Sequence, residues 1–223
     1  MQARFIRNIP ALTEAEQAVL AGKTVAVIGC GGLGGHLIEL LTRVGIGSIR
    51  AVDGDVFEES NLNRQLLATM DTLGRSKAET AAARAAAIDP SLQVRPFSVF
   101  LDETNARELI AGCDVVLDAL DGIEARRVLA RACTESGIPM VYGAISGWVA
   151  QAGISMPGDG LMDALFPAGV EVRDRSVLSF TPALCAAMQT SLCIKLLTGR
   201  PVQTGTVFHF DLLDQEFEVI PML

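Results

Sequence analysis

A glycine-rich turn near the start of the chain has the composition of a phosphate-binding loop. A short apolar run at 24–29 leads into GCGGLGG at 29–35, and a helical pattern follows directly. Gly29, Gly31 and Gly34 match the spacing G-x-G-x-x-G between a strand and a helix. Without Cβ atoms such a turn tightens, and the N–H groups at the helix N-terminus can face phosphate oxygens. The turn predicts a nucleotide site, whereas close packing of helix on strand is the alternative reason for the glycines.

A polar segment after the second predicted strand distinguishes ATP from a dinucleotide. Asp53 ends that strand, where a carboxylate would take the ribose hydroxyls. A dehydrogenase needs only this carboxylate, but the following loop adds Asn and Arg64, and Lys77 opens the next predicted helix. An amide, a guanidinium and an ammonium on one rim suit a triphosphate whose charge moves toward a pyrophosphate leaving group. The segment therefore favours ATP.

Two carboxylates follow the fourth predicted strand, in the sequence DALD. Asp118 ends the strand, and Asp121 lies in the turn after it. Ligands of open α/β sheets bind at the carboxyl ends of strands, and a carboxylate there can hold Mg²⁺ against phosphates. We expect Asp121 rather than Asp118 to be the metal ligand, because a role in shaping the turn would explain Asp118 equally well.

The elements that carry these residues alternate between strands and helices. Strands are predicted at 24–29, 48–53, 92–97, 114–118 and 139–143, and helices at 13–21, 33–44, 77–88 and 124–136. Thr13 and Glu16 predict a capping box at the first helix. Further on, the sequence predicts a strand at 151–155, a mostly loop segment at 156–179, a helix at 182–197 and a hairpin of 206–210 with 216–220. The expected fold is α/β: a Rossmann-like mixed sheet, parallel in its N-terminal part and antiparallel in its C-terminal strands, with helices on both faces.

Composition narrows the class of protein. The chain has 223 residues, is 50% apolar and carries a formal charge of −8, which is the composition of a globular protein. Because no cluster of Lys and Arg stands out, we expect no nucleic-acid partner. The uncharged stretches 137–158 and 176–194 are long enough to span a bilayer. Their Gly, Ser, Pro and Gln residues favour burial in the core or under a second subunit, so we expect no membrane partner. The N-terminus does not resemble a signal peptide, and a cytoplasmic location is expected.

Cysteine usage excludes several kinds of site. The five cysteines include no CxxC pair, which argues against a disulfide framework and a four-cysteine zinc site. Cys185 and Cys193 fall on one face of a predicted helix, where we expect them to be small core residues.

Five motifs, in order along the chain, resemble the ThiF/MoeB/HesA adenylyltransferases, relatives of the ubiquitin-activating enzymes. The motifs are GCGGLGG, D-x-D-x(4)-SNLNRQ at 53–65, the turn from Gly74 to Lys77, LDALDG at 117–122 and IKLLTG at 194–199. The likeness runs from RFIR at 4–7 to the closing hairpin. It implies one adenylation domain, in which 1–22 is a helical arm, 23–143 the nucleotide-binding part and 144–223 the mixed C-terminal part.

The resemblance implies an activity and partners. Members adenylate the C-terminal glycine carboxylate of a small ubiquitin-like (ThiS/MoaD-type) sulfur carrier with Mg·ATP and release pyrophosphate. The expected partners are a carrier ending in Gly-Gly, a second copy in a homodimer, and a separate sulfur donor. The pathway, whether thiamine, molybdopterin or another, is left open.

The resemblance also assigns roles to residues. Gly32 would approach the phosphates, Asp53 would bind ribose, and Asp121 would position Mg²⁺. Arg7 resembles the arginine that family dimers lend to the partner's site. The catalytic residues implied are Arg7, Arg64, Lys77 and Asp121. The nucleotide contacts implied are Gly29, Gly31, Gly32, Gly34, Asp53, Asp55, Ser60, Asn61, Leu62, Asn63, Arg64, Gln65, Lys77 and Asp121.

The sequence departs from its relatives at three places. The two CxxC pairs that hold zinc in many members are missing, so we predict no zinc site. Segment 156–179 lacks the cysteine that some members link to the carrier, so the reaction is expected to stop at the acyl-adenylate. Gly122 stands where the family usually has Asn, and one polar contact is lost there.

Three other functions remain open. A divergent relative would adenylate a carboxylate of a peptide or a tRNA. An NAD-dependent oxidoreductase rests on the glycine pattern alone and lacks an evident proton-transfer histidine. A non-catalytic binding module would have kept the fold only, although Arg64, Lys77 and Asp121 are intact.

Overall fold

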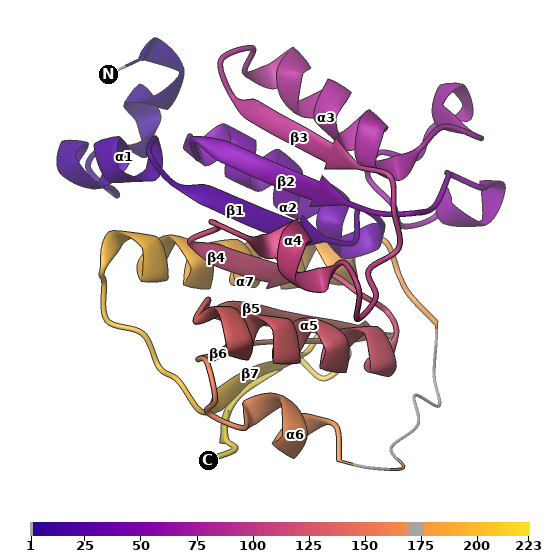
Figure 1. The fold of residues 1–223 in the computed structure, drawn as a ribbon, viewed down its shortest axis with the longest axis vertical. Helices are drawn as coiled ribbons and strands as arrows, with labels where there is room; N and C mark the ends of the chain where they lie inside the picture. Colours follow the sequence, from indigo (N-terminus) through magenta and orange to yellow (C-terminus); the bar gives the residue numbers. More distant parts are fainter. Residues whose placement is uncertain (1, 168, 170–175) are drawn as a thin grey trace.

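An eight-stranded mixed sheet organises the chain. The computed structural model describes residues 2–167, 169 and 176–223. The strands are β1 (Thr24–Ile28), β2 (Ser48–Val52), β3 (Gln93–Phe97), β4 (Val115–Asp118), β5 (Met140–Ser146), β6 (Val149–Ser155), β7 (Thr206–Asp211) and β8 (Glu216–Pro221). Their order is β3-β2-β1-β4-β5-β6-β7-β8 (Figure 1). Strands β1 to β5 pair in parallel, and β5 to β8 pair antiparallel. The predicted fold class is confirmed.

Helices cover both faces of this sheet. They are α1 (Glu14–Leu20), α2 (Gly32–Val44), α3 (Lys77–Ile88), α4 (Ala106–Ile110), α5 (Ile123–Ser136), α6 (Leu161–Leu165) and α7 (Phe180–Thr198). One hydrophobic core joins α2, α3 and α7 to the sheet, and a second core on the other face joins α4, α5 and α6 (Figure 1). Because both faces of β1 and β4 are covered, these strands are apolar almost without interruption.

The capping box predicted for the first helix is confirmed. The Glu16 backbone N–H donates to Thr13 Oγ1 at 3.2 Å, and the Thr13 N–H donates to Glu16 Oε2 at 2.7 Å. Glu16 also receives the Arg200 guanidinium, whose Nε lies 2.5 Å from Oε1. Glu16 therefore joins α1 to Arg200, two residues beyond the end of α7.

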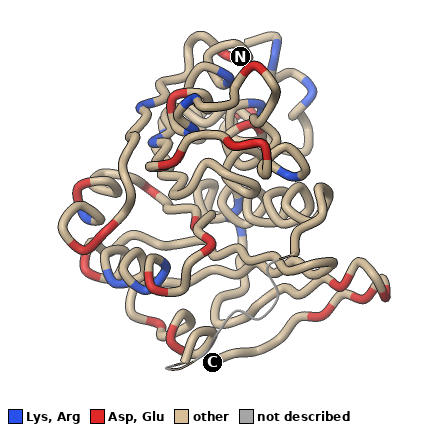
Figure 2. Tube along the Cα trace, turned by 90° about the vertical axis from the view of Figure 1, so that its right-hand side faces the viewer, with Lys and Arg blue, Asp and Glu red and all other residues tan. Residues whose placement is uncertain are grey.

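The two uncharged stretches form the centre of the molecule, as expected. They include β5, β6 and most of α7, and α7 contributes Cys185, Ala186 and Cys193 to the core between it and the sheet. Among the described residues, α7 is the one helix whose length and composition would allow it to cross a membrane, and half of its apolar stretch is buried inside the protein. Charge lies elsewhere: acidic residues gather on the projecting β7–β8 hairpin, at the right of Figure 2.

Short elements are where sequence and structure differ. Helix α4 is not predicted by the sequence, and α6 lies within 156–179, which was expected to be mostly loop. Residues 168 and 170–175 of that segment lie outside the described residues. Both helices are five residues long, too short to form without tertiary contacts, and each buries apolar side chains against the second core. A periodic sequence pattern does not reveal such helices.

Candidate active site

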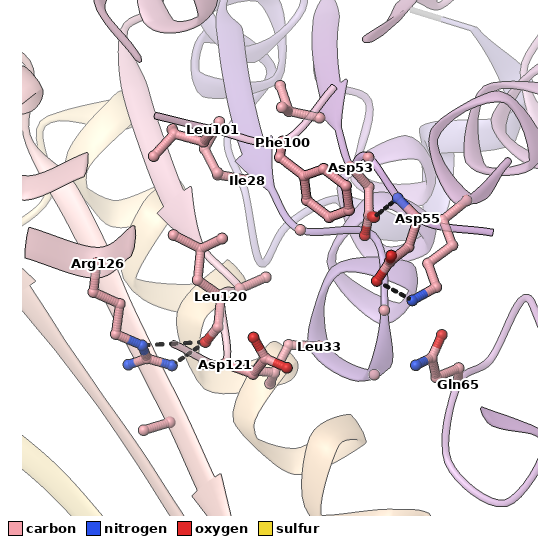
Figure 3. Close-up of a pocket in the computed structure, with 18 of the residues that line it drawn as sticks. Ile28, Leu33, Asp53, Asp55, Gln65, Phe100, Leu101, Leu120, Asp121 and Arg126 are labelled. Atoms are coloured by element: carbon pink, nitrogen blue, oxygen red, sulfur yellow. Dashed lines mark hydrogen bonds and ion pairs between the residues drawn. The ribbon is translucent and has the colours of Figure 1, made fainter. Parts of the chain in front are cut away.

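A pocket lies where the parallel strands end. Its volume is about 400 Å³, and it opens at the carboxyl ends of β1, β2 and β4 (Figure 3). The predicted site residues that line it are Gly29, Gly31, Gly32, Asp53, Asp55, Arg64, Gln65, Lys77 and Asp121. Residues separated by more than ninety positions in the sequence thus meet at one sheet edge, as the topology requires.

The glycines of the turn divide into two kinds. Gly29 has φ +98°, and a Cβ there would lie 2.5 Å from the Ala119 carbonyl oxygen. A Cβ at Gly34 would overlap the Gly29 carbonyl oxygen, and Gly34 does not line the pocket. At Gly32 the nearest heavy atom to an added Cβ is 3.6 Å away, on Pro182. Packing therefore requires glycine at 29 and 34, whereas at Gly32 the space in front of the turn is free for a ligand.

Asp53 is fixed by the same turn. Its Oδ2 accepts the Cys30 N–H at 2.7 Å, and its Oδ1 accepts the Asp55 N–H at 2.8 Å. Burial raises the pKa of the Asp53 carboxyl, and these two hydrogen bonds oppose the shift. The carboxylate lies in the pocket wall, within reach of a hydroxyl donor of a ligand (Figure 3).

Cationic and amide groups line the next part of the rim. Lys77 Nζ lies 3.2 Å from Asp55 Oδ2, and 9% of the lysine side chain is exposed. Arg64 donates from one Nη to the Ser60 carbonyl oxygen and to Asn63 Oδ1, both at 2.9 Å. The Gln65 side chain is buried, and its Oε1 has no hydrogen-bond partner among the described residues. These groups offer donors and positive charge to an anion.

Five of the predicted nucleotide contacts do not line the pocket: Gly34, Ser60, Asn61, Leu62 and Asn63. Two of them shape the loop instead. Asn61 Oδ1 accepts the Glu58 N–H at 3.1 Å, and Asn63 Nδ2 donates to the Val177 carbonyl oxygen at 3.2 Å. The loop is thereby folded so that Arg64 and Gln65 reach the pocket.

The two carboxylates after β4 have different environments. Asp118 is fully buried, its Oδ1 accepts the Leu120 N–H at 3.0 Å, and its Oδ2 lies 3.3 Å from Arg126 Nη1. Burial raises the pKa of Asp118, against the lowering effect of Arg126. Asp121 is exposed and lines the pocket (Figure 3). Asp118 therefore shapes the turn, and Asp121 is available to a ligand.

Arg7 lies away from this pocket. It belongs to a short 3-10 helix, Ala3–Asn8, and Asn8 Nδ2 donates to the Val44 carbonyl oxygen at the C-terminal end of α2. The glycine-rich turn is at the other end of that helix, about 20 Å away for thirteen residues. Within one chain, the structure does not bring Arg7 to the other site residues.

Sequence reasoning missed the apolar half of the pocket and one arginine. Ile28, Val52, Phe100, Leu101, Leu120 and Ile123 supply apolar surface, and Phe166 and Arg126 complete the wall. Arg126 had a usable signal, because it lies in the first turn of the helix that follows Asp121. Phe100 and Phe166 follow from the folding of loops, which no periodic pattern encodes.

The donor set at the rim fits Mg²⁺ accompanied by phosphates. Asp121 offers carboxylate oxygens, and Mg²⁺ is commonly bound by one or two carboxylates together with substrate phosphates. Among the described residues, no group of three or more His, Cys, Asp or Glu side chains gathers to hold a metal ion. A divalent cation here would thus depend on the phosphates of a nucleotide.

Several known proteins have sequences similar to this chain. The chain is 37% identical to the SAMP-activating enzyme E1 of Haloferax volcanii over 212 residues, 92% of this chain and 78% of that protein. It is 32% identical to the sulfur carrier protein ThiS adenylyltransferase of Bacillus subtilis, over 90% of this chain and 61% of that protein. It is also 32% identical to a probable adenylyltransferase/sulfurtransferase, MoeZ of Mycobacterium tuberculosis, and spans 59% of its length.

Solved structures show the same fold. Escherichia coli MccB with ATP superposes with a TM-score of 0.84 at 20% identity, over the whole of this chain and 72% of that chain. PaaA superposes with a TM-score of 0.80 at 23% identity, over 94% of this chain and 76% of that chain. A sequence profile of the ThiF family matches residues 3–222. The chain therefore belongs to the ThiF family of adenylyltransferases.

Proposed function

We propose that the chain adenylates the C-terminal glycine carboxylate of a small ubiquitin-like sulfur carrier with Mg·ATP, and releases pyrophosphate. One observation carries the proposal: the glycine turn, Lys77 and Asp121 line a single pocket at the carboxyl ends of parallel strands. The relatives above 30% identity supply the acceptor class, since one is named for SAMP and another for ThiS.

In this reaction the protein has to position the two reactants and neutralise their negative charge. The acceptor carboxylate attacks the α-phosphorus, a P–O bond to the acyl group forms, and the bond to pyrophosphate breaks. A glycine carboxylate is already ionised at neutral pH, so no general base is needed. Both reactants are anions, and Arg64 and Lys77 would offset their charge. Mg²⁺, held by Asp121 and the phosphates, would supply the remaining positive charge.

The apolar end of the pocket suits a slender peptide tail. Ala144, Ile145 and Val177 are part of the apolar lining of the pocket. Trp148 and Phe180 are partly exposed near that end, with ring centroids 5.1 Å apart. Gly147, which precedes Trp148, forms a β-bridge with the pocket residue Val177 and accepts a hydrogen bond from Thr181 Oγ1, next to Phe180, at 2.8 Å. A Gly-Gly terminus, which lacks side chains, is the kind of tail that would thread past these groups.

The reaction would stop at the acyl-adenylate, with no covalent cysteine intermediate. All five cysteines are buried, and burial raises the pKa of each thiol. A thiol that is buried and protonated is a poor nucleophile. Sulfur would then come from a separate donor protein. We further propose a cytoplasmic homodimer, in which Arg7 of each subunit serves the other's site.

The test is exchange of labelled pyrophosphate into ATP. Exchange that requires a purified carrier of the ubiquitin-like fold, and is lost when its terminal Gly-Gly is removed, would support the proposal. Exchange with short peptides but with no carrier would show that the acceptor is a peptide carboxylate and not a carrier protein. Binding of NAD but not ATP by calorimetry would overturn the adenylation itself.

A further inference from the structure

Arg126 is a buried arginine whose surroundings are unusually specific. It lies in the first turn of α5, and 6% of its side chain is exposed. Its guanidinium carbon lies 5.2 Å from the ring centroid of Tyr142 and 5.6 Å from that of Phe166. Two aromatic rings, inclined at 73° to each other, thus flank the guanidinium, and such surroundings suit arginine better than lysine.

The guanidinium is bonded to the turn that carries Asp121. Nε donates to the Leu120 carbonyl oxygen at 3.1 Å, and Nη2 donates to the same oxygen (Figure 3). Nη1 lies 3.3 Å from Oδ2 of Asp118. The Asp118 carboxylate in turn accepts the Leu120 N–H at 3.0 Å. Both polar groups of the Leu120 backbone are therefore held by this ion pair.

The start of the same turn is held from α7. Gln189 Nε2 donates to the Asp118 carbonyl oxygen at 2.8 Å and to the Val141 carbonyl oxygen at 3.1 Å. Asp121 is the next residue after Leu120 and is exposed. Within the described part of the chain its carboxylate has no hydrogen bond or ion pair, so its position there is set by its neighbours in the turn.

Stability alone explains this pair poorly. Removing two opposite charges from water costs about as much as their attraction returns, so a buried pair is a weak source of stability. Apolar residues of similar volume would fill the same space between Tyr142 and Phe166. The geometry gives the pair a different use, since two N–H groups of Arg126 bond the Leu120 carbonyl oxygen at the rim of the pocket, and Nη1 forms an ion pair, without a hydrogen bond, with Asp118.

We propose that Arg126 is a positioning residue: with Asp118 it holds the Leu120 backbone, and thereby places the Asp121 carboxylate where the metal of a bound Mg·ATP needs it. The inference rests on the proposed function, because it assigns a support to the metal ligand of that site. Arg126 itself acts through Leu120 and not on the reacting atoms.

The first test is Arg126→Lys, which keeps the charge beside Asp118 but loses the planar fork that grips Leu120. Binding of Mn²⁺ to the enzyme with a non-hydrolysable ATP analogue is followed by electron paramagnetic resonance, and Mg²⁺ is titrated in the exchange assay. We expect the Mn²⁺ dissociation constant and the half-saturating Mg²⁺ to rise at least about fivefold. The exchange rate should fall about tenfold or more, because small displacements of a catalytic group have effects of that size.

A second variant separates positioning from folding. Asp118→Asn with Arg126→Gln removes both charges, so that no unpaired buried charge remains. We expect its melting temperature to stay near that of the wild type while its metal dependence stays impaired. Arg131→Gln is the matched control, since Arg131 is on the same helix and pairs with the exposed Glu103. It should leave metal binding and exchange unchanged.

The outcomes are distinguishable. Wild-type metal dependence in Arg126→Lys, recovery of metal binding in the double variant, or a double variant that fails to fold would each overturn the inference. Absence of carrier-dependent exchange in the wild type would instead overturn the proposed function. Metal binding by the nucleotide complex would still report on Arg126 in that case.

Discussion

Lys77 Nζ lies 3.2 Å from Oδ2 of Asp55, across the rim of the pocket, and little of the lysine side chain is exposed. The lysine is thus held by a carboxylate beside the place where we expect phosphates. A triphosphate carries more negative charge than one carboxylate. The Lys77 ammonium can therefore exchange its ion pair with Asp55 for one with the phosphates while it stays at the rim. Asp55, with more than half of its side chain exposed, can remain solvated when that happens.

This relationship predicts different effects for its two members. Lys77→Ala should reduce pyrophosphate exchange by about a hundredfold or more, because a positive charge that stabilises the transition state is lost. Asp55→Asn breaks the same ion pair but leaves the ammonium in place, so it should keep most of the exchange activity. Equal losses in both variants would show that the pair matters for structure and not for the phosphates.

The glycine-rich turn predicts a contrast between Gly34 and Gly32. Gly34→Ala should lower the free energy of unfolding by roughly 2 kcal/mol or more, because its Cβ would overlap the Gly29 carbonyl. Gly32→Ala has room for the methyl group, and it should change stability little while weakening ATP binding severalfold. Thermal unfolding and calorimetric titration with ATP measure the two effects. Unchanged ATP affinity in Gly32→Ala would contradict a close approach of phosphate at this position.

Much of this organisation follows from local sequence signals. The strands that surround the pocket are short apolar runs, and the cap of α1 is a four-residue pattern, so both are predictable. The sequence also places Asp53, Lys77 and Asp121 at the same sheet edge, because strand ends of a parallel sheet meet there. Phe100, Phe166 and the bond from Arg126 to Leu120 depend on how loops and short helices fold, and local patterns do not specify that.

The cap of α1 predicts a dependence of stability on pH. Hydrogen bonding to Arg200 and Thr13 lowers the pKa of Glu16 from 4.5 to about 2. Because the folded-state pKa is the lower one, the stabilisation is fully present above about pH 4.5 and is lost between pH 4.5 and about 2. Glu16→Gln should therefore be less stable than the wild type at pH 7, and the two melting temperatures should converge as the pH falls toward 2. A constant difference over this range would contradict the assignment.

Gly122 caps α5 without a side-chain hydrogen bond, in an extended conformation with φ −104°. A Cβ added there would meet nothing within 4 Å. Gly122→Asn should therefore stabilise the protein by a few tenths of a kcal/mol, since Asn can accept from the first free N–H groups of the helix. Denaturant unfolding measures the gain. A loss of stability would show that the carboxamide disturbs the turn next to Asp121.

Arg7 and Lys77 predict complementation between inactive subunits. Arg7 lies at the C-terminal end of α2, and Lys77 lies in the pocket at the other end of that helix. In a homodimer that shares its sites, Arg7→Ala and Lys77→Ala should each be inactive alone. A mixed dimer has one site with both residues intact, because the Lys77 of one subunit meets the Arg7 of the other. Co-expressed variants should then recover about a quarter of the wild-type exchange activity, because about half of the dimers are mixed and each mixed dimer has one intact site of two.

The matched control for this experiment is a mixture whose changes fall in the same pocket. Lys77→Ala mixed with Asp121→Ala should recover no activity. Both residues belong to the pocket of one subunit, so each site of the mixed dimer lacks one of them. Recovery in the Arg7 mixture alone would show that Arg7 acts across the interface. If the Arg7→Ala protein is fully active, or sedimentation equilibrium finds a stable monomer with full activity, the arginine has no part in the site and the pocket of one chain is sufficient.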